Sequence, residues 1–183
     1  LVSWANFNFS CTGAQRWDKA WHFCRLAGDR AMAVYANVEA TRFYDNALGA
    51  GRRQRSVTAR DLAELYERSA DARYRLGEFD AADHGYSAAR RLLDNDPLQA
   101  SPLVVKQAMI ATRTAAYRKA LVRVKRALRT LEHDQSREAA ANRSRLMVPI
   151  GTVKYLQGRH VESIYWCLRA IDEARRGDAR DAL

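Results

Sequence analysis

The stretch that decides the fold runs from Asp61 to Pro97 and reads DLAELYERSADARYRLGEFDAADHGYSAARRLLDNDP. Its first half predicts an amphipathic helix, because one face is marked at spacings of three and four by Leu62, Leu65, Tyr66, Ser69, Ala70, Arg73 and Leu76. Gly77 then supplies the permissive backbone that suits a helix C-terminus. A second apolar stripe follows, with alanines where helices approach closely: Phe79, Ala82, Tyr86 and Ala89. We therefore predict a hairpin of two antiparallel helices that needs neighbours to bury its remaining face.

This hairpin resembles a tetratricopeptide repeat (TPR). The family carries a large and a small residue in its first helix, a Gly-x-aromatic turn, an Ala-aromatic-Ala second helix and a late proline, in a unit of about 34 residues. These roles fall to Tyr66, Ala70, Gly77, Phe79, Ala82, Tyr86, Ala89 and Pro97. The resemblance implies an all-α fold, a right-handed α-solenoid of TPR-like helical hairpins.

The composition agrees with a helical protein. The 183 residues include only 3 Pro and 9 Gly, and 31 Lys+Arg against 21 Asp+Glu give a net charge of +10. Such a charge favours acidic partners, nucleic acid or anionic membrane, without deciding the fold. The scattered, odd-numbered Cys11, Cys24 and Cys167 predict a reducing compartment rather than a disulfide framework. No apolar run is long enough to predict a membrane span, and the start at Leu1 suggests a piece of a longer protein.

The first 51 residues predict an irregular version of the same array. We expect Trp4, Phe7 and Phe9 on a first helix. A helix from Trp17 should end near Gly28, and after a short helix another should begin near Val38. That last helix repeats the second-helix stripe at Ala40, Tyr44 and Ala47. Trp17 and Trp21 lie four apart, and we interpret them as core packing rather than a ligand platform.

The segment from Ala14 to Leu48, AQRWDKAWHFCRLAGDRAMAVYANVEATRFYDNAL, carries a second resemblance. It is similar to the helical region that follows the ATPase module in large actinobacterial signalling proteins, which often begin with a class III nucleotide cyclase domain. The resemblance implies a regulatory or assembly region and brings no catalytic residue with it.

Beyond a linker-like break at Gly49 to Thr58, the repeats continue with wider spacing. Ser101-Pro102 should start a helix, because serine caps helices and proline is tolerated in the first turn. We expect turns at Ala115-Ala116 and Gly158, and we expect Pro149 to kink or split its helix. The predicted organisation is therefore residues 1–51 as irregular TPR-like helices, and residues 58–183 as three hairpins continuous with them in one solenoid.

The sequence offers little for catalysis. The histidines His22, His84, His133 and His160 show no metal-ligand spacing with one another or with the cysteines. Neither a glycine-rich phosphate loop nor a zinc-protease or nucleophile-elbow motif is present. We expect no catalytic residue, no metal site and no cofactor in this chain.

The family resemblance implies a binding groove along the first helix of each hairpin. Carried over residue by residue, its lining is Glu64, Glu67, Asp71, Tyr74, Arg75, Met109, Arg113, Arg145, Thr152 and Tyr155. This groove would run from acidic to basic, and it lacks the Lys and Asn pair with which some members clamp a peptide carboxylate. A ligand of mixed charge, or another domain of the same protein, would fit it better.

A second candidate surface is the basic face of the helix expected from Tyr117. Its cations are Arg118, Lys119, Arg123, Lys125, Arg126 and Arg129, with no acidic residue among them. Like charges three and four apart destabilise a helix, which indicates an acidic partner. Nucleic acid recognition usually adds aromatic residues for stacking, and only Tyr117 is available here.

These observations favour a non-catalytic protein-protein interaction or regulatory segment of a larger cytoplasmic signalling protein, linked to a nucleotide cyclase or an ATPase. The expected partner is a protein or peptide, including another domain of the same parent protein, with no membrane contact. The alternatives are a basic helical-repeat nucleic-acid binder and an intracellular peptide receptor. Self-association through an exposed terminal hairpin is also compatible with a solenoid.

Overall fold

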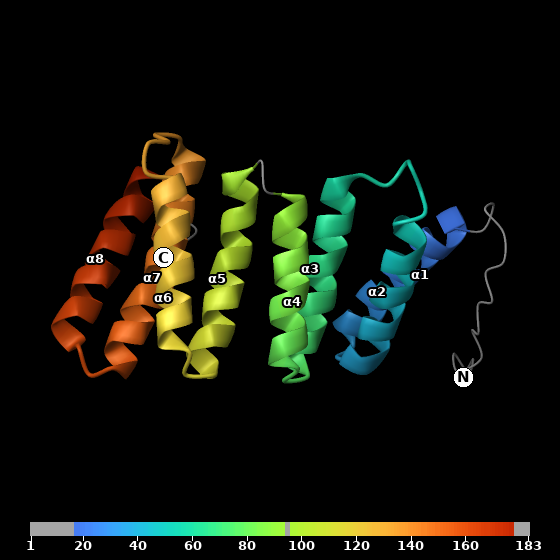
Figure 1. The fold of residues 1–183 in the computed structure, drawn as a ribbon, viewed down its shortest axis with the longest axis horizontal. Helices are drawn as coiled ribbons and strands as arrows, with labels where there is room; N and C mark the ends of the chain where they lie inside the picture. Colours follow the sequence, from blue (N-terminus) through green and yellow to red (C-terminus); the bar gives the residue numbers. More distant parts are fainter. Residues whose placement is uncertain (1–16, 94–95, 178–183) are drawn as a thin grey trace.

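The computed structural model describes residues 17–93 and 96–177, which form eight helices packed as sequential hairpins (Figure 1). The helices are α1 (Trp17–Ala33), α2 (Asn37–Gly51), α3 (Ala59–Arg75), α4 (Phe79–Leu92), α5 (Pro97–Arg113), α6 (Tyr117–Thr130), α7 (Arg137–Leu156) and α8 (His160–Arg176). The all-α expectation is confirmed. Each hairpin pairs an odd-numbered first helix with the even-numbered second helix that follows it, and neighbouring hairpins pack in chain order.

The turn inside each of the four hairpins contains a residue with positive φ. Gly77 (79°) and Gly158 (73°) adopt this conformation at no steric cost, as the sequence predicted for both turns. The other two hairpins place Tyr35 (60°) and Ala115 (55°) at the same point. Ala115 confirms the turn expected there without glycine, whereas the turn at Tyr35 was not predicted. The turn residues 35, 77, 115 and 158 give the four hairpins a common reference point.

The expectation that the helix from Trp17 ends near Gly28 is wrong. The helix α1 continues to Ala33 and is the first helix of a hairpin with α2. Gly28 lies inside α1. A Cβ atom at this position would come within 2.4 Å of the Tyr44 ring, so the close approach of the two helices requires glycine here. The expected stripe of α2 is confirmed, since Ala40, Tyr44 and Ala47 are buried. The predicted helix with Trp4, Phe7 and Phe9 lies outside the described residues.

Side-chain caps fix the starts of three first helices. Thr58 and Asp61 form a reciprocal capping box at α3, in which Thr58 Oγ1 accepts from the Asp61 amide at 3.1 Å. Ser136 accepts from the Ala139 amide at the start of α7. Asp96 caps α5 by accepting from the Gln99 amide, so the helix begins at Pro97 and not at Ser101-Pro102 as expected.

Pro102 and Pro149 both lie inside helices. Pro102 in α5 has no N–H for the carbonyl of Leu98, and that carbonyl accepts instead from Ser101 Oγ (3.2 Å) and from Asn142 Nδ2 of α7 (3.1 Å). Pro149 lies within α7, which continues unbroken from Arg137 to Leu156. The predicted splitting of this helix does not occur.

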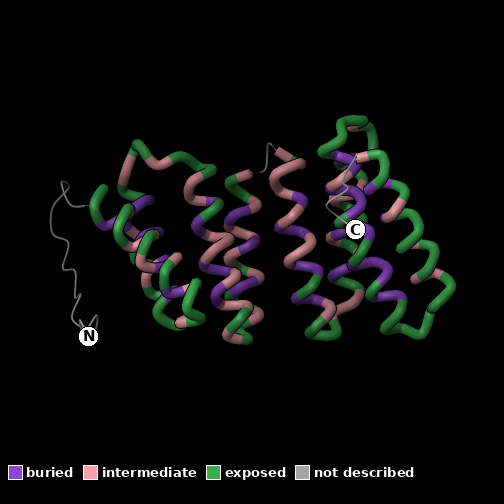
Figure 2. Tube along the Cα trace, turned by 180° about the vertical axis from the view of Figure 1, so that it is seen from behind, coloured by how far each residue is buried: buried purple, intermediate pink, exposed green. Residues whose placement is uncertain are grey.

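The core is a chain of small clusters rather than one centre. Tyr44, Leu65 and Ala72 share a cluster that joins α2 to α3, and Tyr86, Leu103 and Ile110 share one that joins α4 to α5. A third cluster joins α5, α6 and α7 around Val124, Leu146 and Ile150. Buried residues accordingly recur along the length of the array (Figure 2). Such a molecule is held together by nearest-neighbour contacts between hairpins.

Candidate functional site

The acidic residues of the predicted groove are joined by a cation that the sequence analysis did not include. Lys106 of α5 lies 2.7 Å from Glu67 Oε1 and 2.7 Å from both carboxylate oxygens of Asp71 on α3. Glu64 pairs with Arg68 one turn further along its own helix. Burial alone would lower the pKa of Lys106, but hydrogen bonds from its ammonium to Asp71 and Glu67 outweigh burial and raise it. Lys106 and Arg68 therefore offset part of the negative charge of Glu64, Glu67 and Asp71, and Arg68 also pairs with Asp29.

The carboxylate of Asp71 takes part in a set of contacts that occurs twice, once in each of the first two hairpins. Tyr86 donates to Asp71 at 2.6 Å, and Tyr44 donates to Asp29 at 2.8 Å, each across its own hairpin. Asp29 also accepts from Arg68 of the next first helix at 2.9 Å, as Asp71 does from Lys106. Burial, followed by the adjacent carboxylate, raises the pKa of both tyrosines well above its usual value. These tyrosines and aspartates are structural links between consecutive hairpins.

Aromatic and cationic side chains meet further along the groove. The Arg113 guanidinium lies 5.4 Å from the centre of the Tyr74 ring, and this contact joins α5 to α3. The Tyr74 ring also packs against Phe79, with 5.7 Å between the ring centres. Arg75 lies over the ring of Tyr35 at 5.8 Å. The structure thus brings Tyr74 and Arg113 together into one polar and aromatic patch.

The remaining predicted groove residues are exposed. Met109 of α5 is accessible, and α7 presents Arg145, Thr152 and Tyr155. The Thr152 hydroxyl donates to the carbonyl of Val148, and the Tyr155 ring lies edge-on to His160 with 5.4 Å between ring centres. The two patches, one on α3 and α5 and one on α7, make up the accessible part of the predicted groove.

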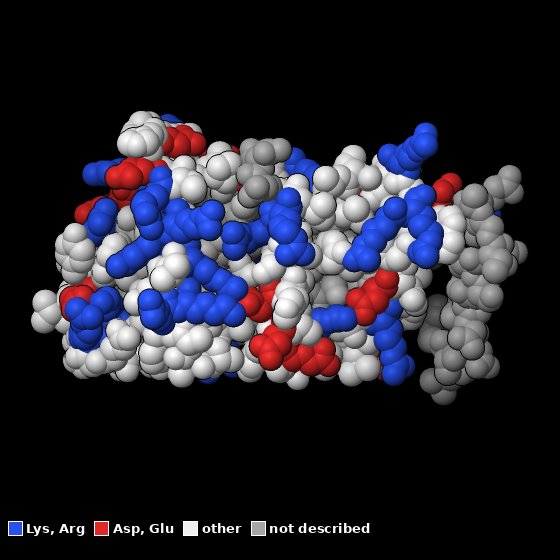
Figure 3. Space-filling model, in the orientation of Figure 1, with Lys and Arg blue, Asp and Glu red and all other residues white. Residues whose placement is uncertain are grey.

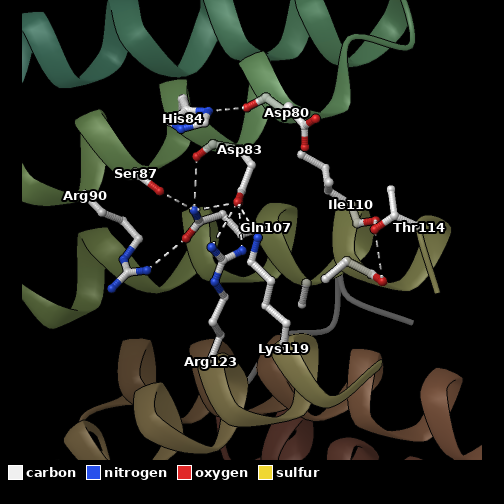
Figure 4. A network of polar contacts seen from close by, with 12 residues as sticks. Asp80, Asp83, His84, Ser87, Arg90, Gln107, Ile110, Thr114, Lys119 and Arg123 are labelled. Atoms are coloured by element: carbon white, nitrogen blue, oxygen red, sulfur yellow. Dashed lines mark hydrogen bonds and ion pairs between the residues drawn. The ribbon is translucent and has the colours of Figure 1, made fainter. Parts of the chain in front are cut away.

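Two cations of the basic helix α6 have an acidic counterpart within the chain itself, on the helix α4. Asp83 of α4 accepts from Arg123 at 2.7 and 2.9 Å and from Lys119 at 3.0 Å (Figure 4). The buried Gln107 of α5 also donates to Asp83, at 2.9 Å. Burial alone would raise the pKa of Asp83, but the hydrogen bonds from Arg123 and Lys119 outweigh it and hold the pKa below its usual range.

The other four cations of α6 are not bound by Asp83. Arg118, Lys125, Arg126 and Arg129 are exposed, and none is paired with a carboxylate in the part of the chain that the structure describes. On the face seen in Figure 3, Lys and Arg side chains gather over α6 and its neighbours. The accessible basic face is thus smaller than the six residues predicted from the sequence.

An open cleft of about 520 Å³ lies beside this basic face, between α6 and α8. Leu128, Met147 and Trp166 are apolar residues of its lining. Its cationic residues are Lys125, Arg129, Arg143, Arg169 and Arg176. The buried Arg143 pairs with Glu173 at 2.8 Å, and Arg169 covers the Trp166 ring at 5.3 Å. The arrangement can receive an anionic group next to an apolar one.

Among residues 17–93 and 96–177, no three His, Cys, Asp or Glu side chains are grouped so that they could hold a metal ion. None of the helices in these ranges is long and apolar enough to cross a membrane.

The fold matches solved structures of TPR-like proteins at low sequence identity. MamA superposes with a TM-score of 0.55 at 12% identity, over 91% of this chain and 89% of that chain. BtubC (BKLC) from P. vanneervenii gives 0.52 at 16% identity, over 94% of each chain. The Rap conjugation gene regulator of plasmid pLS20, in complex with the Phr* peptide, gives 0.51 at 16% identity, over 93% of this chain and 58% of that chain. At these identities the likeness shows the fold, a TPR-like helical-repeat array.

No protein-family model matches the sequence, and neither does any curated protein sequence.

Proposed function

We propose that this chain is a non-catalytic segment that binds a protein or peptide within a larger cytoplasmic signalling protein, whose cyclase or ATPase lies outside the chain. The observation that carries the proposal is the patch formed by Tyr74 and Arg113 on neighbouring first helices. A cation stacked on an aromatic ring, beside the exposed Met109, offers a peptide both a carboxylate partner and an apolar contact.

The solved structures support this proposal at the level of the fold. One of them, the Rap regulator, is in complex with a peptide. In this chain Lys106 already holds the acidic residues Glu67 and Asp71, so a ligand would meet mainly Arg113, Arg145 and exposed aromatic and apolar side chains. We therefore expect a peptide with acidic and apolar residues. Its binding would position the catalytic domain of the parent protein.

Selection of peptides from a random displayed library tests this function directly. Peptides that bind the wild-type chain should lose affinity about tenfold or more with Arg113→Glu, because the change places a carboxylate where the ligand needs a cation. The matched control is Arg118→Glu, the same charge change on the exposed face of α6, which should alter the affinity less than about twofold. If no peptide is selected, or if only the control variant loses binding, this proposal is wrong.

A second candidate function rests on the four unpaired cations of α6. We infer that Arg118, Lys125, Arg126 and Arg129 would meet the phosphates of a nucleic acid if that were the partner. Titration of a fluorescent single-stranded oligonucleotide across a salt series distinguishes the candidates. Steep loss of affinity with salt, removed by Arg126→Glu but not by Arg113→Glu, would favour nucleic acid. Binding that is weak and insensitive to both variants would exclude it.

A further inference from the structure

The open cleft between α6 and α8 is separate from the predicted groove. Its volume is about 520 Å³, and its walls are two consecutive second helices, with Arg143 and Met147 of α7 between them. The predicted groove follows the first helices, and none of its residues lines the cleft. Because each wall packs on α7, the cleft does not depend on where the chain begins or ends.

The cleft has an apolar lining where the preceding contact between hairpins is polar. On α4, α5 and α6, this contact is the hydrogen-bonded network of Asp83, Gln107 and Arg123. The same three positions on α6, α7 and α8, counted from the turn residues, hold apolar residues of one core cluster: Leu121, Ile150 and Trp166. Trp166 therefore lines the cleft at the position where Arg123 pairs with Asp83 in the preceding hairpins.

Lys125 of α6 lacks the partner within the chain that its counterpart on α2 has. Counted from the turn residue, Asp45 stands at the same position of α2, where it accepts from Ser69 of α3 at 3.4 Å. The residue of α7 at the position of Ser69 is Ile150, which is buried and apolar. Lys125 is therefore exposed in the lining of the cleft, and within the described residues its ammonium group has no hydrogen-bonding partner on α7.

Cations without a carboxylate partner stand on both walls of the cleft. Lys125 and Arg129 belong to the α6 wall. Arg169 belongs to the α8 wall, with its guanidinium 5.3 Å from the centre of the Trp166 ring. In the part of the chain that the structure describes, none of these three cations pairs with a carboxylate. Glu132 in the same lining offsets one of their charges, so the excess stays positive.

The other charged groups of the lining are already held within the chain. Arg143 donates to Glu173 of α8 at 2.8 Å and to the carbonyls of Leu131 and Asp134 at 2.8 and 2.5 Å. Glu173 also accepts from Arg176 at 3.2 Å. The side chains of Arg143 and Glu173 are only 10% and 11% exposed. Because two cations hold Glu173, its carboxylate does not cancel the charge of the three cations on the walls.

We propose that this cleft binds an acidic segment of a partner protein, at a second site beside the one described under the proposed function. An apolar side chain of the segment contacts Leu128, Met147 and Trp166. Carboxylates on either side of that side chain pair with the cations of the two walls, Arg129 on α6 and Arg169 on α8. The site therefore selects Asp or Glu on both sides of an apolar residue.

Nucleic acid fits this cleft less well than an acidic segment does. A base would have to stack on the Trp166 ring, where Arg169 already lies. A continuous line of phosphates would also meet the carboxylate of Glu132. Separate carboxylates around one apolar residue avoid both conflicts.

NMR with isotope labels on the methionine methyl groups tests the site, because the 3 methionines of the chain report separate places. Met147 lines the cleft, Met109 lies beside the proposed peptide-binding patch, and Met32 lies on α1. The probe is the end-blocked peptide Gly-Glu-Glu-Phe-Leu-Glu-Glu-Gly. It should shift the Met147 signal with a Kd below about 1 mM and leave the Met32 signal in place. Replacing Phe-Leu by Gly-Gly, or each Glu by Lys, should weaken this binding at least about tenfold.

Two variants at the same position of neighbouring second helices locate the contact. Arg129 of α6 and Arg91 of α4 are equally far from their turn residues, both are exposed, and only Arg129 lines the cleft. Arg129→Glu should weaken the binding seen at Met147 at least about tenfold. Arg91→Glu, the same charge change outside the cleft, should alter it less than about twofold. Circular dichroism of both variants verifies folding.

Four outcomes would overturn the proposal. The Met147 signal stays in place up to about 1 mM peptide, or the Gly-Gly peptide binds as well as the original. Both variants weaken binding equally, which would show a diffuse effect of charge. A single-stranded oligonucleotide shifts the Met147 signal and the peptide does not, which would assign the cleft to nucleic acid. A shift at Met109 alone would instead support the peptide-binding patch on α3 and α5, so the two proposals can fail separately.

Discussion

At the scale of single residues, Asp83 ties three helices together, as Asp29 and Asp71 do in the earlier hairpins. It projects from α4 and accepts from Gln107 of α5 and from Lys119 and Arg123 of α6 (Figure 4). Its side chain is only 13% exposed, so these bonds act in a medium less polar than water. The pKa of the carboxyl group is depressed, which makes the contribution of Asp83 to stability dependent on pH.

The sign of this dependence follows from the depressed pKa. The contribution of Asp83 is fully present above the ordinary carboxyl pKa of about 4, and it is lost as pH falls through the lower folded-state value. Asp83→Asn should lower the free energy of unfolding by about 1–3 kcal/mol at pH 7. The difference between the variant and wild type should shrink towards pH 3. Urea unfolding at both pH values measures it, and a difference that is constant with pH would contradict the assignment.

Ala115 offers a second prediction at this scale. Its φ of 55° is unfavourable for a residue with a Cβ atom, and glycine adopts that conformation freely. Ala115→Gly should therefore raise the free energy of unfolding by about 0.5–1 kcal/mol. Ala116→Gly is the control, because Ala116 has a φ of −78° and the added backbone freedom should destabilise the chain. Thermal unfolding of the two variants should shift in opposite directions; equal shifts would show that the turn is unstrained.

At the scale of helices, two glycines of the first hairpin make a matched pair. A Cβ atom on Gly28 of α1 would meet the Tyr44 ring at 2.4–3.0 Å, while on Gly49 of α2 the nearest other atom is Arg53 Nη1 at 3.8 Å. Gly28→Ala should force the ring to move and cost about 1–3 kcal/mol of unfolding free energy. Gly49→Ala should stabilise α2 by about 0.5–1 kcal/mol. Chemical denaturation distinguishes them, and similar effects would mean that α1 and α2 do not approach so closely.

The sequence predicted the helices best where packing is local. The hairpin from Asp61 to Pro97 was predictable because its apolar stripes and its turn glycine agree within one stretch. The helix α1 was not, because Gly28 resembles a stop signal until its partner Tyr44 is known. The start of α5 was also missed. The carbonyl of Leu98, which Pro102 leaves without its helical partner, accepts from Ser101 and from Asn142, and Asn142 is too far along the chain to be foreseen as a partner.

The candidate site was less predictable than the fold for the same reason. The lining of the groove was predicted from repeat positions and stays a prediction, but polar partners of several of those residues come from the next hairpin. Lys106 pairs with both Glu67 and Asp71, and Asp83 pairs with cations of α6, and these residues are too far apart in the sequence for a local pattern to reveal the pairs. Peptide-facing positions carry no packing requirement, so one sequence does not reveal their ligand.

At the scale of the whole molecule, the two helices of each hairpin pack on one another, and each hairpin also packs on those next to it in the chain. The predicted groove and the basic face of α6 are separate surfaces of this array. A partner in the predicted groove and a polyanion on α6 can therefore each be tested with a variant that leaves the other surface unchanged. Within residues 17–93 and 96–177, the first and last hairpins each pack against one other hairpin, so these two should open first when the 183-residue chain is destabilised.

The placement of tryptophan has a spectroscopic consequence. Within the described residues, Trp17 and Trp21 lie on α1, where Arg53 and Arg25 stack on their rings, and Trp166 lies on α8 under Arg169. Between α2 and α7 these residues include no tryptophan. Once Trp4, which lies outside these residues, is replaced by phenylalanine, tryptophan fluorescence should report the first and last hairpins, whereas circular dichroism averages over all eight helices. Without added labels, fluorescence can thus follow the opening of the first and last hairpins, and circular dichroism can follow the loss of helix in the whole array.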